Sequence, residues 1–427
     1  MGFDLKVKAF NYGGHMKKIF KYMDKHLGYF LILPALFFIV VFSILPIAES
    51  IKYSVFDFQL NDQQKSGLYF KEHYNVDLMT ETFEYIDYYL NTEIETAEKE
   101  KTLKLLEEAK NISSESYEKI QTLLPTTGIV SLNEEEKEII VKASDDVTEI
   151  INNVYKEEDI FYAKEDMKMI LSELETAIIK PNFIGIDNFK TALSDKRVGF
   201  AFFITIVFTV ASISLELGLG LMLALIMNRA MKGRGLVRTF SLIPWAIPTS
   251  VAALIWAYLY NGSSGIVSVL LEKVGILSNA TDLLLSGKSA LVAIIMADVW
   301  KTTPYMALLL LAGLQVISYS LYEASSLDGA SKLQQFRHVT LPLLKPAILV
   351  ALLFRTLDAF RIFDLIFVLT GGGPGGKTES ISLYAYKVMF AQTRFGYGSA
   401  VVVIMAVVVA IISYLYIKFL DVQLISD

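Results

Sequence analysis

Two apolar stretches carry charged side chains at spacings that suit the binding of a polar ligand. Between residues 346 and 370, Arg355, Asp358, Arg361 and Asp364 recur every three residues with alternating sign. Carboxylates accept hydrogen bonds from hydroxyl groups and guanidinium groups donate to oxygens, so the set suits a polyhydroxyl ligand. Helical neighbours three residues apart also pair with each other. The alternative is therefore that these charges only hold helices together.

The second stretch, residues 289–317, carries Asp298 and Lys301, followed by Thr302 and Tyr305. Charged side chains inside a bilayer are costly and usually face a cavity or one another. We expect the polar groups of the two stretches to meet at one depth and line a cavity. Aromatic rings can stack on the C–H faces of a sugar or simply anchor helices at the interface; the candidates are Trp245, Trp256, Tyr260, Trp300 and Tyr305.

The elements that position these residues are membrane-length apolar runs. The chain has 427 residues, 53% of them hydrophobic, and a mean hydropathy of +0.45. Roughly 20 apolar residues cross the hydrocarbon core as a helix. Six runs qualify, so we predict an all-α polytopic membrane protein rather than a large soluble core; the runs are 27–48, 198–227, 239–260, 289–317, 346–370 and 397–417.

Metal and nucleotide chemistry find little support in this chain. It has no cysteine, which excludes disulfides and thiolate sites, and its four histidines lack metal-ligand spacing. The glycine-rich run 371–376, followed by Lys377 and Thr378, matches the letters of the G-x-x-x-x-G-K-[ST] phosphate loop, but we expect it to be an outer loop and not a phosphate-binding site. We therefore expect no catalytic residue, no metal and no cofactor in this chain.

Charge distribution predicts the orientation of the spans. Short cytoplasmic loops are rich in Lys and Arg. Six lysines precede the first run, and Arg229, Lys232, Arg234 and Arg238 follow the second. We expect residues 1–26 to be a cytoplasmic segment, 27–60 the first span and its exit, and both termini to lie in the cytoplasm.

Residues 61–181 form an acidic insert between the first two spans, and hence lie outside. Within 62–180 there are 28 acidic residues and 13 lysines, a balance of −15. Asn133 with Glu136 three residues on predicts a capped helix start, and apolar residues recur at helical spacing from Ile139 to Val154. We predict a helical extracytoplasmic domain whose acidic surface is solvated, with docking of a soluble partner as the alternative.

A polar segment between the fourth and fifth spans reads EASSLDGASKLQQFRHVTLP from Glu323 to Pro342. It resembles the E-A-A-x3-G-x9-I-x-L-P coupling loop of ABC-importer permeases, with Ser325 for alanine and Val339 for isoleucine. The segments Phe183–Phe189, Pro244–Pro248 and Leu369–Pro374, and the run around Arg355–Asp364, resemble those of binding-protein-dependent sugar permeases of the maltose or trehalose type. The insert is the main departure.

This resemblance implies six spans of the importer-permease type, with 182–427 as the five-span core and 318–342 as the cytoplasmic coupling loop. It implies a second permease, two ATPase subunits that bind ATP and Mg, and an extracytoplasmic sugar-binding protein. A di- or oligosaccharide would be the cargo. Coupling to the ATPase would fall on Glu323, Ala324, Ser325, Asp328, Gly329, Leu341 and Pro342.

Two alternatives stay open. One is an ABC permease for another small polar solute. The other is a membrane receptor whose acidic outer domain senses a ligand, which would need a cytoplasmic signalling domain beyond the short tail 421–427.

Overall fold

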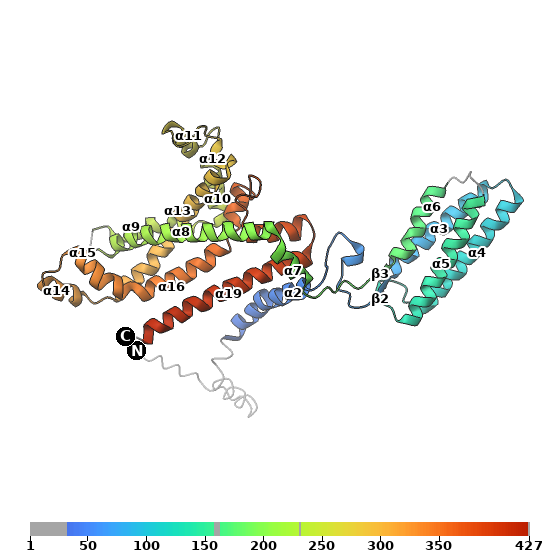
Figure 1. The fold of residues 1–427 in the computed structure, drawn as a ribbon, viewed down its shortest axis with the longest axis horizontal. Helices are drawn as coiled ribbons and strands as arrows, with labels where there is room; N and C mark the ends of the chain where they lie inside the picture. The colour runs from blue at the N-terminus through green and yellow to red at the C-terminus, as the bar shows by residue number, and fades with distance from the viewer. Residues whose placement is uncertain (1–31, 158–162, 230–231, 426–427) are drawn as a thin grey trace, which may run out of the picture. The chain divides into compact units, whose positions relative to one another are not determined.

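The computed structural model describes residues 32–157, 163–229 and 232–425 (Figure 1). The chain divides into a unit that ends at Lys52 and a unit that begins at Tyr53. An apolar helix spans Ile32–Ser54, and its last part, Leu45–Ser54, is α2. The most apolar stretch of this helix, long enough to cross a membrane, contains no buried residue. The predicted cytoplasmic segment 1–26 and the start of the first span lie outside the described residues.

Four helices of the insert pack around one apolar core. They are α3 (Val76–Thr96), α4 (Glu100–Leu123), α5 (Glu134–Glu157) and α6 (Lys164–Thr176). Helix α3 packs on α4 and α6, and α5 packs on the same two helices, which closes the bundle (Figure 1). Ile86, Leu106, Ile140 and Ile151 are fully buried in its core. Most acidic side chains lie outside this core because each helix is amphipathic. Glu93 is an exception: it is buried and accepts a hydrogen bond from the Ala163 N–H (2.8 Å).

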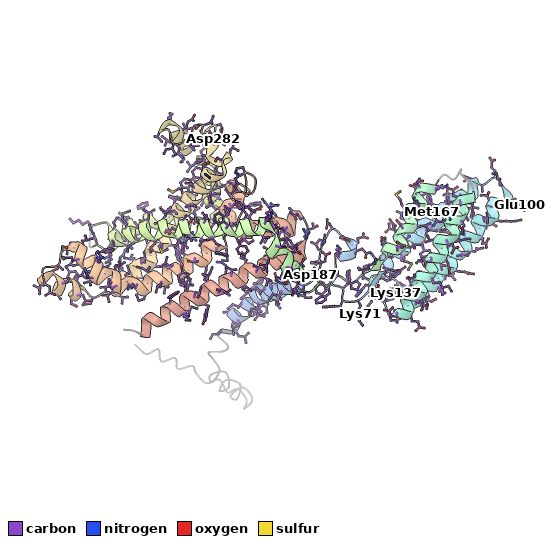
Figure 2. The ribbon with its side chains drawn as sticks, viewed as in Figure 1. Lys71, Glu100, Lys137, Met167, Asp187 and Asp282 are labelled. Atoms are coloured by element: carbon purple, nitrogen blue, oxygen red, sulfur yellow. The ribbon has the colours of Figure 1, made fainter. Side chains whose placement is uncertain are left out.

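A small sheet closes one end of the bundle, and the prediction of a purely helical insert missed it. Strand β1 (His73–Asn75) lies between β2 (Ile129–Ser131) and β3 (Ile178–Ile179), antiparallel to both. Lys71 and Lys137 lie at this end, and Glu100 lies at the other (Figure 2). Strands of two or three residues are too short to show a period of two in the sequence.

Hydrogen bonds join the two chain segments that enter and leave the insert. The Asn182 amide donates to the carbonyl oxygens of Asp57 (3.2 Å) and Gly67 (2.8 Å), and its oxygen accepts from the Tyr69 N–H (2.9 Å). Burial opposes ionisation of Asp57, but hydrogen bonds from Lys65 and Gln59 outweigh it and keep the pKa of this carboxyl below its usual value.

The remaining helices contain the apolar spans. Among the described residues, five helices are long and apolar enough to cross a membrane, or six if one bent pair counts as a span. The helices of this part are α7 (Asp187–Ser194), α8 (Lys196–Asn228), α9 (Arg234–Ala246), α10 (Thr249–Leu259), α11 (Ile266–Lys273), α12 (Asp282–Leu285), α13 (Gly287–Val316), α14 (Tyr319–Leu327), α15 (Lys332–Gln335), α16 (Leu341–Phe360), α17 (Asp364–Leu369), α18 (Ile381–Tyr386) and α19 (Phe395–Ile425).

The predicted third span, 239–260, is not one continuous helix. Helices α9 and α10 meet at an angle of 89°. Ile247 is extended between them and Pro248 precedes the first residue of α10. Proline disfavours helical geometry in the residue before it, which accounts for the break.

The predicted fifth span, 346–370, is wrong at both ends. Helix α16 already begins at Leu341, where it continues a π-helical turn at Phe336–Thr340, and it ends at Phe360. A separate short helix, α17, starts at Asp364. Neither proline nor glycine marks this break; the Ser380 hydroxyl instead donates to the Ile362 carbonyl (2.8 Å), a contact made by a residue distant in sequence.

The predicted start of helix α5 is confirmed and makes a test possible. The Asn133 side chain accepts from the Glu136 N–H (2.8 Å), and Glu136 accepts from the Asn133 N–H (3.0 Å). Asn133→Ala should lower the local opening free energy of the first turn by about 1 kcal/mol. Hydrogen exchange of this turn in the intact protein should then speed up. Asn153→Ala, at an exposed position of the same helix, should change nothing; equal rates in both variants would contradict the assignment.

Candidate functional site

Helices α8, α13 and α16 pack against one another and carry the intramembrane charges (Figure 1). Two glycines allow the close approach. A Cβ on Gly220 of α8 would lie 2.8 Å from the Met306 side chain, and a Cβ on Gly313 of α13 would lie 2.4 Å from the Ala347 Cβ. Small residues at such contacts are a general means of bringing membrane helices together.

Arg355 of α16 is the centre of the resulting network. Its Nε and Nη2 donate to the two carboxylate oxygens of Glu216 on α8, at 2.5 and 2.9 Å. Nη2 also donates to Asp298 on α13, and Nη1 donates to Asp358 at 3.0 Å. Arg355 is 1% exposed and Glu216 0%. Because a guanidinium has five donors in one plane, it can satisfy all three carboxylates at once.

Glu216 was not among the expected site residues, although it is the one charge in an otherwise apolar run, 198–227. An ionisable residue inside a membrane span is by default a candidate for function, and that was the available signal. Its partner Arg355 lies 139 residues further on. Nothing in the sequence favours one charged residue of the other spans as this partner, and only the packing of α8 on α16 decides it.

The four charges expected to form a ladder along one helix take different positions. Arg355 pairs with Asp358, and Asp358 lies 3.9 Å from Arg361. The side chains of Asp358 and Arg361 are each 63% exposed. Asp364 is exposed, lies beyond the break, and makes no ion pair within the described part of the chain. The series of ion pairs therefore stops at Arg361, the residue that follows the end of α16.

The candidates on α13 also separate into buried and accessible groups. The Thr302 hydroxyl lies 2.8 Å from Glu216 Oε1 and 2.6 Å from the Asp298 carbonyl oxygen. Lys301 is 9% exposed, and its ammonium makes no hydrogen bond or ion pair to a described residue. Tyr305 is half-buried. The structure thus brings Asp298, Thr302 and Arg355 together in the interior. The charged stretches 289–317 and 346–370 therefore meet at this point.

The aromatic candidates form two groups. Trp256 contacts Tyr260 and Trp300 edge-on or tilted, and the buried Tyr260 hydroxyl donates to the Ala293 carbonyl (3.0 Å), so this group packs helices. Trp245 and Tyr305 instead stack face to face, with ring centroids 5.5 Å apart and planes 13° apart. Trp245 remains 44% exposed. This pair offers an accessible ring surface.

The segment between α13 and α16 folds into a compact turn. Gly329 has φ +80° between α14 and α15, so it supplies the bend between these two short helices. Buried Gln335 fixes the turn by donating to the Tyr322 carbonyl (3.2 Å) and the Ser326 hydroxyl (2.7 Å). Ser331 and Gln334 form a capping box at the start of α15.

This turn presents a surface suited to a partner. Leu327 and Leu333 are 90% and 75% exposed. Of the residues expected to couple, Glu323, Ala324 and Asp328 are exposed and Ser325 is half-buried. Leu341 and Pro342 form the first residues of α16, so the turn passes directly into the helix that carries Arg355. Among the described residues, no group of three acidic or histidine side chains is arranged to hold a metal ion.

Comparisons with known proteins place this architecture in a family. The family model described as binding-protein-dependent transport system inner membrane component matches residues 216–424. The trehalose/maltose transport system permease MalF of Thermococcus litoralis is 47% identical over 243 residues, 57% of this chain and 81% of that protein. The trehalose transport system permease SugA of Mycobacterium tuberculosis is 44% identical over 55% of this chain and 74% of its own length.

Two further similarities extend the comparison. The sulfoquinovosyl glycerol transport system permease SmoG of Agrobacterium fabrum is 37% identical over 57% of this chain and 79% of its own length. Among solved structures, a chain of a bacterial ABC transporter involved in the import of the acidic polysaccharide alginate superposes with a TM-score of 0.51. It is 25% identical, and the match covers 56% of this chain and 84% of that one.

The chain belongs to the inner membrane components of binding-protein-dependent transport systems, the permease subunits of ABC importers. The predicted family and the all-α polytopic fold are confirmed. The protein is accordingly a multi-pass inner membrane protein and a transport component.

The burial of Arg355 predicts a difference in stability between two arginines of the same segment. Arg355→Ala would leave Glu216 and Asp298 without their counter-charge in the interior, which costs about 3–5 kcal/mol. Arg361→Ala removes a side chain that is 63% exposed and should change stability little. Thermal unfolding of the two purified variants in one detergent measures this. Equal melting temperatures would show that the network does not support the fold.

Proposed function

We propose that this permease imports a di- or oligosaccharide of the trehalose or maltose type. Kinship makes the chain a sugar ABC-importer permease: two relatives that are 47% and 44% identical are permeases of trehalose/maltose and trehalose systems. The structural observation that supports the proposal is that Asp358 is an accessible carboxylate held by the buried Arg355. Such a group can accept hydrogen bonds from sugar hydroxyls without being free to turn away.

We propose that the accessible candidates contact the sugar and that the buried ones support them. Asp358 and Asp364 accept from hydroxyls, Arg361 donates to sugar oxygens, and Tyr305 stacked on Trp245 offers a ring face to the apolar side of a pyranose. Asp298, Lys301, Thr302 and Arg355 lie behind this surface. A sugar site needs both kinds of residue, since polar contacts select only when they are fixed.

The proposed complex contains a second permease, two ATPase subunits that bind ATP and Mg, and an extracytoplasmic sugar-binding protein. Both termini of this chain lie in the cytoplasm. One ATPase grips the exposed turn around Gly329, with Leu327 and Leu333 as apolar contacts and Glu323 and Asp328 available for basic partners.

In this mechanism, closure of the ATPases on ATP moves the turn, and α16 carries the movement to Asp358. The cavity then opens outward to receive the sugar. After hydrolysis the turn returns, and the sugar leaves toward the cytoplasm. This chain contributes no chemistry to hydrolysis. Its part is to transmit a movement of the turn at the start of α16 to Asp358 near the end of the helix.

The sugar contacts can be tested on the assembled complex in proteoliposomes. Asp358→Ala and Arg361→Ala should lower ATPase activity stimulated by the sugar-loaded binding protein more than the basal activity, because they remove the proposed contacts to the sugar. Uptake of trehalose, maltose and a sulfonated sugar, measured side by side, defines the cargo. Equal loss of basal and stimulated activity, together with poor yield, would favour a purely structural role.

The coupling turn has a matched control within the chain. Gly329 and Gly275 have φ of +80° and +77°, and a Cβ on either would meet nothing within 4 Å. Gly329→Asp should abolish sugar uptake while the protein still reaches the membrane, since it strains the bend and adds a charge at the contact. Gly275→Asp carries the same backbone strain and should keep most uptake. Normal uptake by Gly329→Asp would exclude the assignment of the turn.

A further inference from the structure

Glu216 is fully buried on α8, carries a carboxylate, and has no direct access to the proposed sugar surface. Its two oxygens are occupied by Arg355 Nε and Nη2, and the Thr302 hydroxyl approaches one of them at 2.8 Å. Placing a glutamate in the interior of three packed membrane helices is costly. The arrangement therefore calls for a role that an apolar side chain at this position would not fill.

The geometry of the guanidinium group suggests that role. Arg355 is planar, and its five donors point in fixed directions. Glu216 occupies the Nε–Nη2 edge as a bidentate partner, and Asp298 takes a second bond from Nη2. Once this edge is fixed, the direction of Nη1 is fixed as well. Nη1 is the atom that donates to Asp358 at 3.0 Å.

We propose that Glu216 is a positioning residue for the sugar site, which acts through the Arg355 guanidinium to hold the Asp358 carboxylate in the pathway. The proposal rests on the proposed function, in which Asp358 contacts the sugar. Asp298 assists from α13, so the accessible carboxylate on α16 is oriented by two buried carboxylates on two other helices.

A purely structural role explains less of the arrangement. The three helices already meet through an apolar cluster that includes Ala224, Met306, Leu310 and Leu344. Replacing a buried ion pair by apolar groups is often neutral or stabilising, so helix packing alone does not call for Glu216. The network also does not stop inside the protein; its last member, Asp358, is 63% exposed.

The charges around the guanidinium make its orientation sensitive to Glu216. Arg355 faces Glu216, Asp298 and Asp358, while Lys301 and Arg361 are the other cations nearby in sequence on α13 and α16. Without the charge of Glu216, the Nε–Nη2 edge of the guanidinium loses its bidentate partner, and the group can turn toward Asp298. Asp358 then loses a fixed donor, although the Gln variant still fills the space.

The test is a double-mutant cycle on the assembled complex in proteoliposomes, with saturating binding protein loaded with the transported disaccharide. The variants are Glu216→Gln, Asp358→Asn and the double variant, with Glu272→Gln as a matched change at an exposed position. The measured quantity is the number of sugars transported per ATP hydrolysed. A structural defect lowers both rates together, whereas a mispositioned Asp358 lowers transport for the same hydrolysis.

We expect Glu216→Gln and Asp358→Asn each to lower this ratio roughly tenfold, the effect of one charge-assisted hydrogen bond. The double variant should be no worse than Asp358→Asn alone, and Glu272→Gln should be unchanged. Additive losses in the double variant would overturn the positioning role. A normal ratio for Glu216→Gln would also overturn it. If Asp358→Asn itself keeps a normal ratio, the proposed sugar contact fails instead, which separates the two hypotheses.

Discussion

The core of this permease depends on one buried cation. Arg355 is 1% exposed, and in the interior of a membrane protein its charge can be retained only if carboxylates surround it. Glu216 and Asp298 supply them from two different helices. The network can form only where α8, α13 and α16 come within reach of one guanidinium. Gly220 and Gly313, where any larger side chain would collide with the neighbouring helix, make this approach possible.

Helix α16 connects the exposed turn around Gly329 with the proposed sugar site. It begins at Leu341, directly after the exposed turn around Gly329, and ends at Phe360, two residues after Asp358. Its 20 residues span about 30 Å as a regular helix. In the proposed mechanism, a displacement at the turn is passed along this helix to the break at residues 361–363. The Arg355 network holds α16 five residues before its end at Phe360.

The insert folds around a hydrophobic core of its own. Its four helices and small sheet enclose a hydrophobic cluster of their own, formed by residues from Tyr74 to Ala177. The matches to relatives cover little more than half of this chain. Asn182 ties together the segments that enter and leave the insert. The fold of the insert thus depends on contacts within the insert. The network around Arg355 involves none of these residues.

The sequence by itself determined what depends on local chemistry. Apolar runs specified most of the membrane helices, and Asn133 with Glu136 specified the start of α5. Pro248 even marked the break between α9 and α10, although the run was interpreted as one span. Each of these features involves residues within a few positions of one another.

Only the tertiary structure decided which charges meet and which remain accessible. Arg355 and Asp358 lie in the same charged run, and nothing in the sequence indicates which of them is buried. Arg355 is buried because it faces α8 and α13, whereas Asp358 is exposed. Just after the end of α16, the Ser380 hydroxyl donates a hydrogen bond to the Ile362 carbonyl. The partner of Arg355 is Glu216, which is also distant in the chain. Periodicity gives the face of a helix but not the neighbour that covers it. For this reason candidate residues for the proposed sugar site could be named from the sequence, while the packing that buries Arg355 between Glu216 and Asp298 could not be predicted.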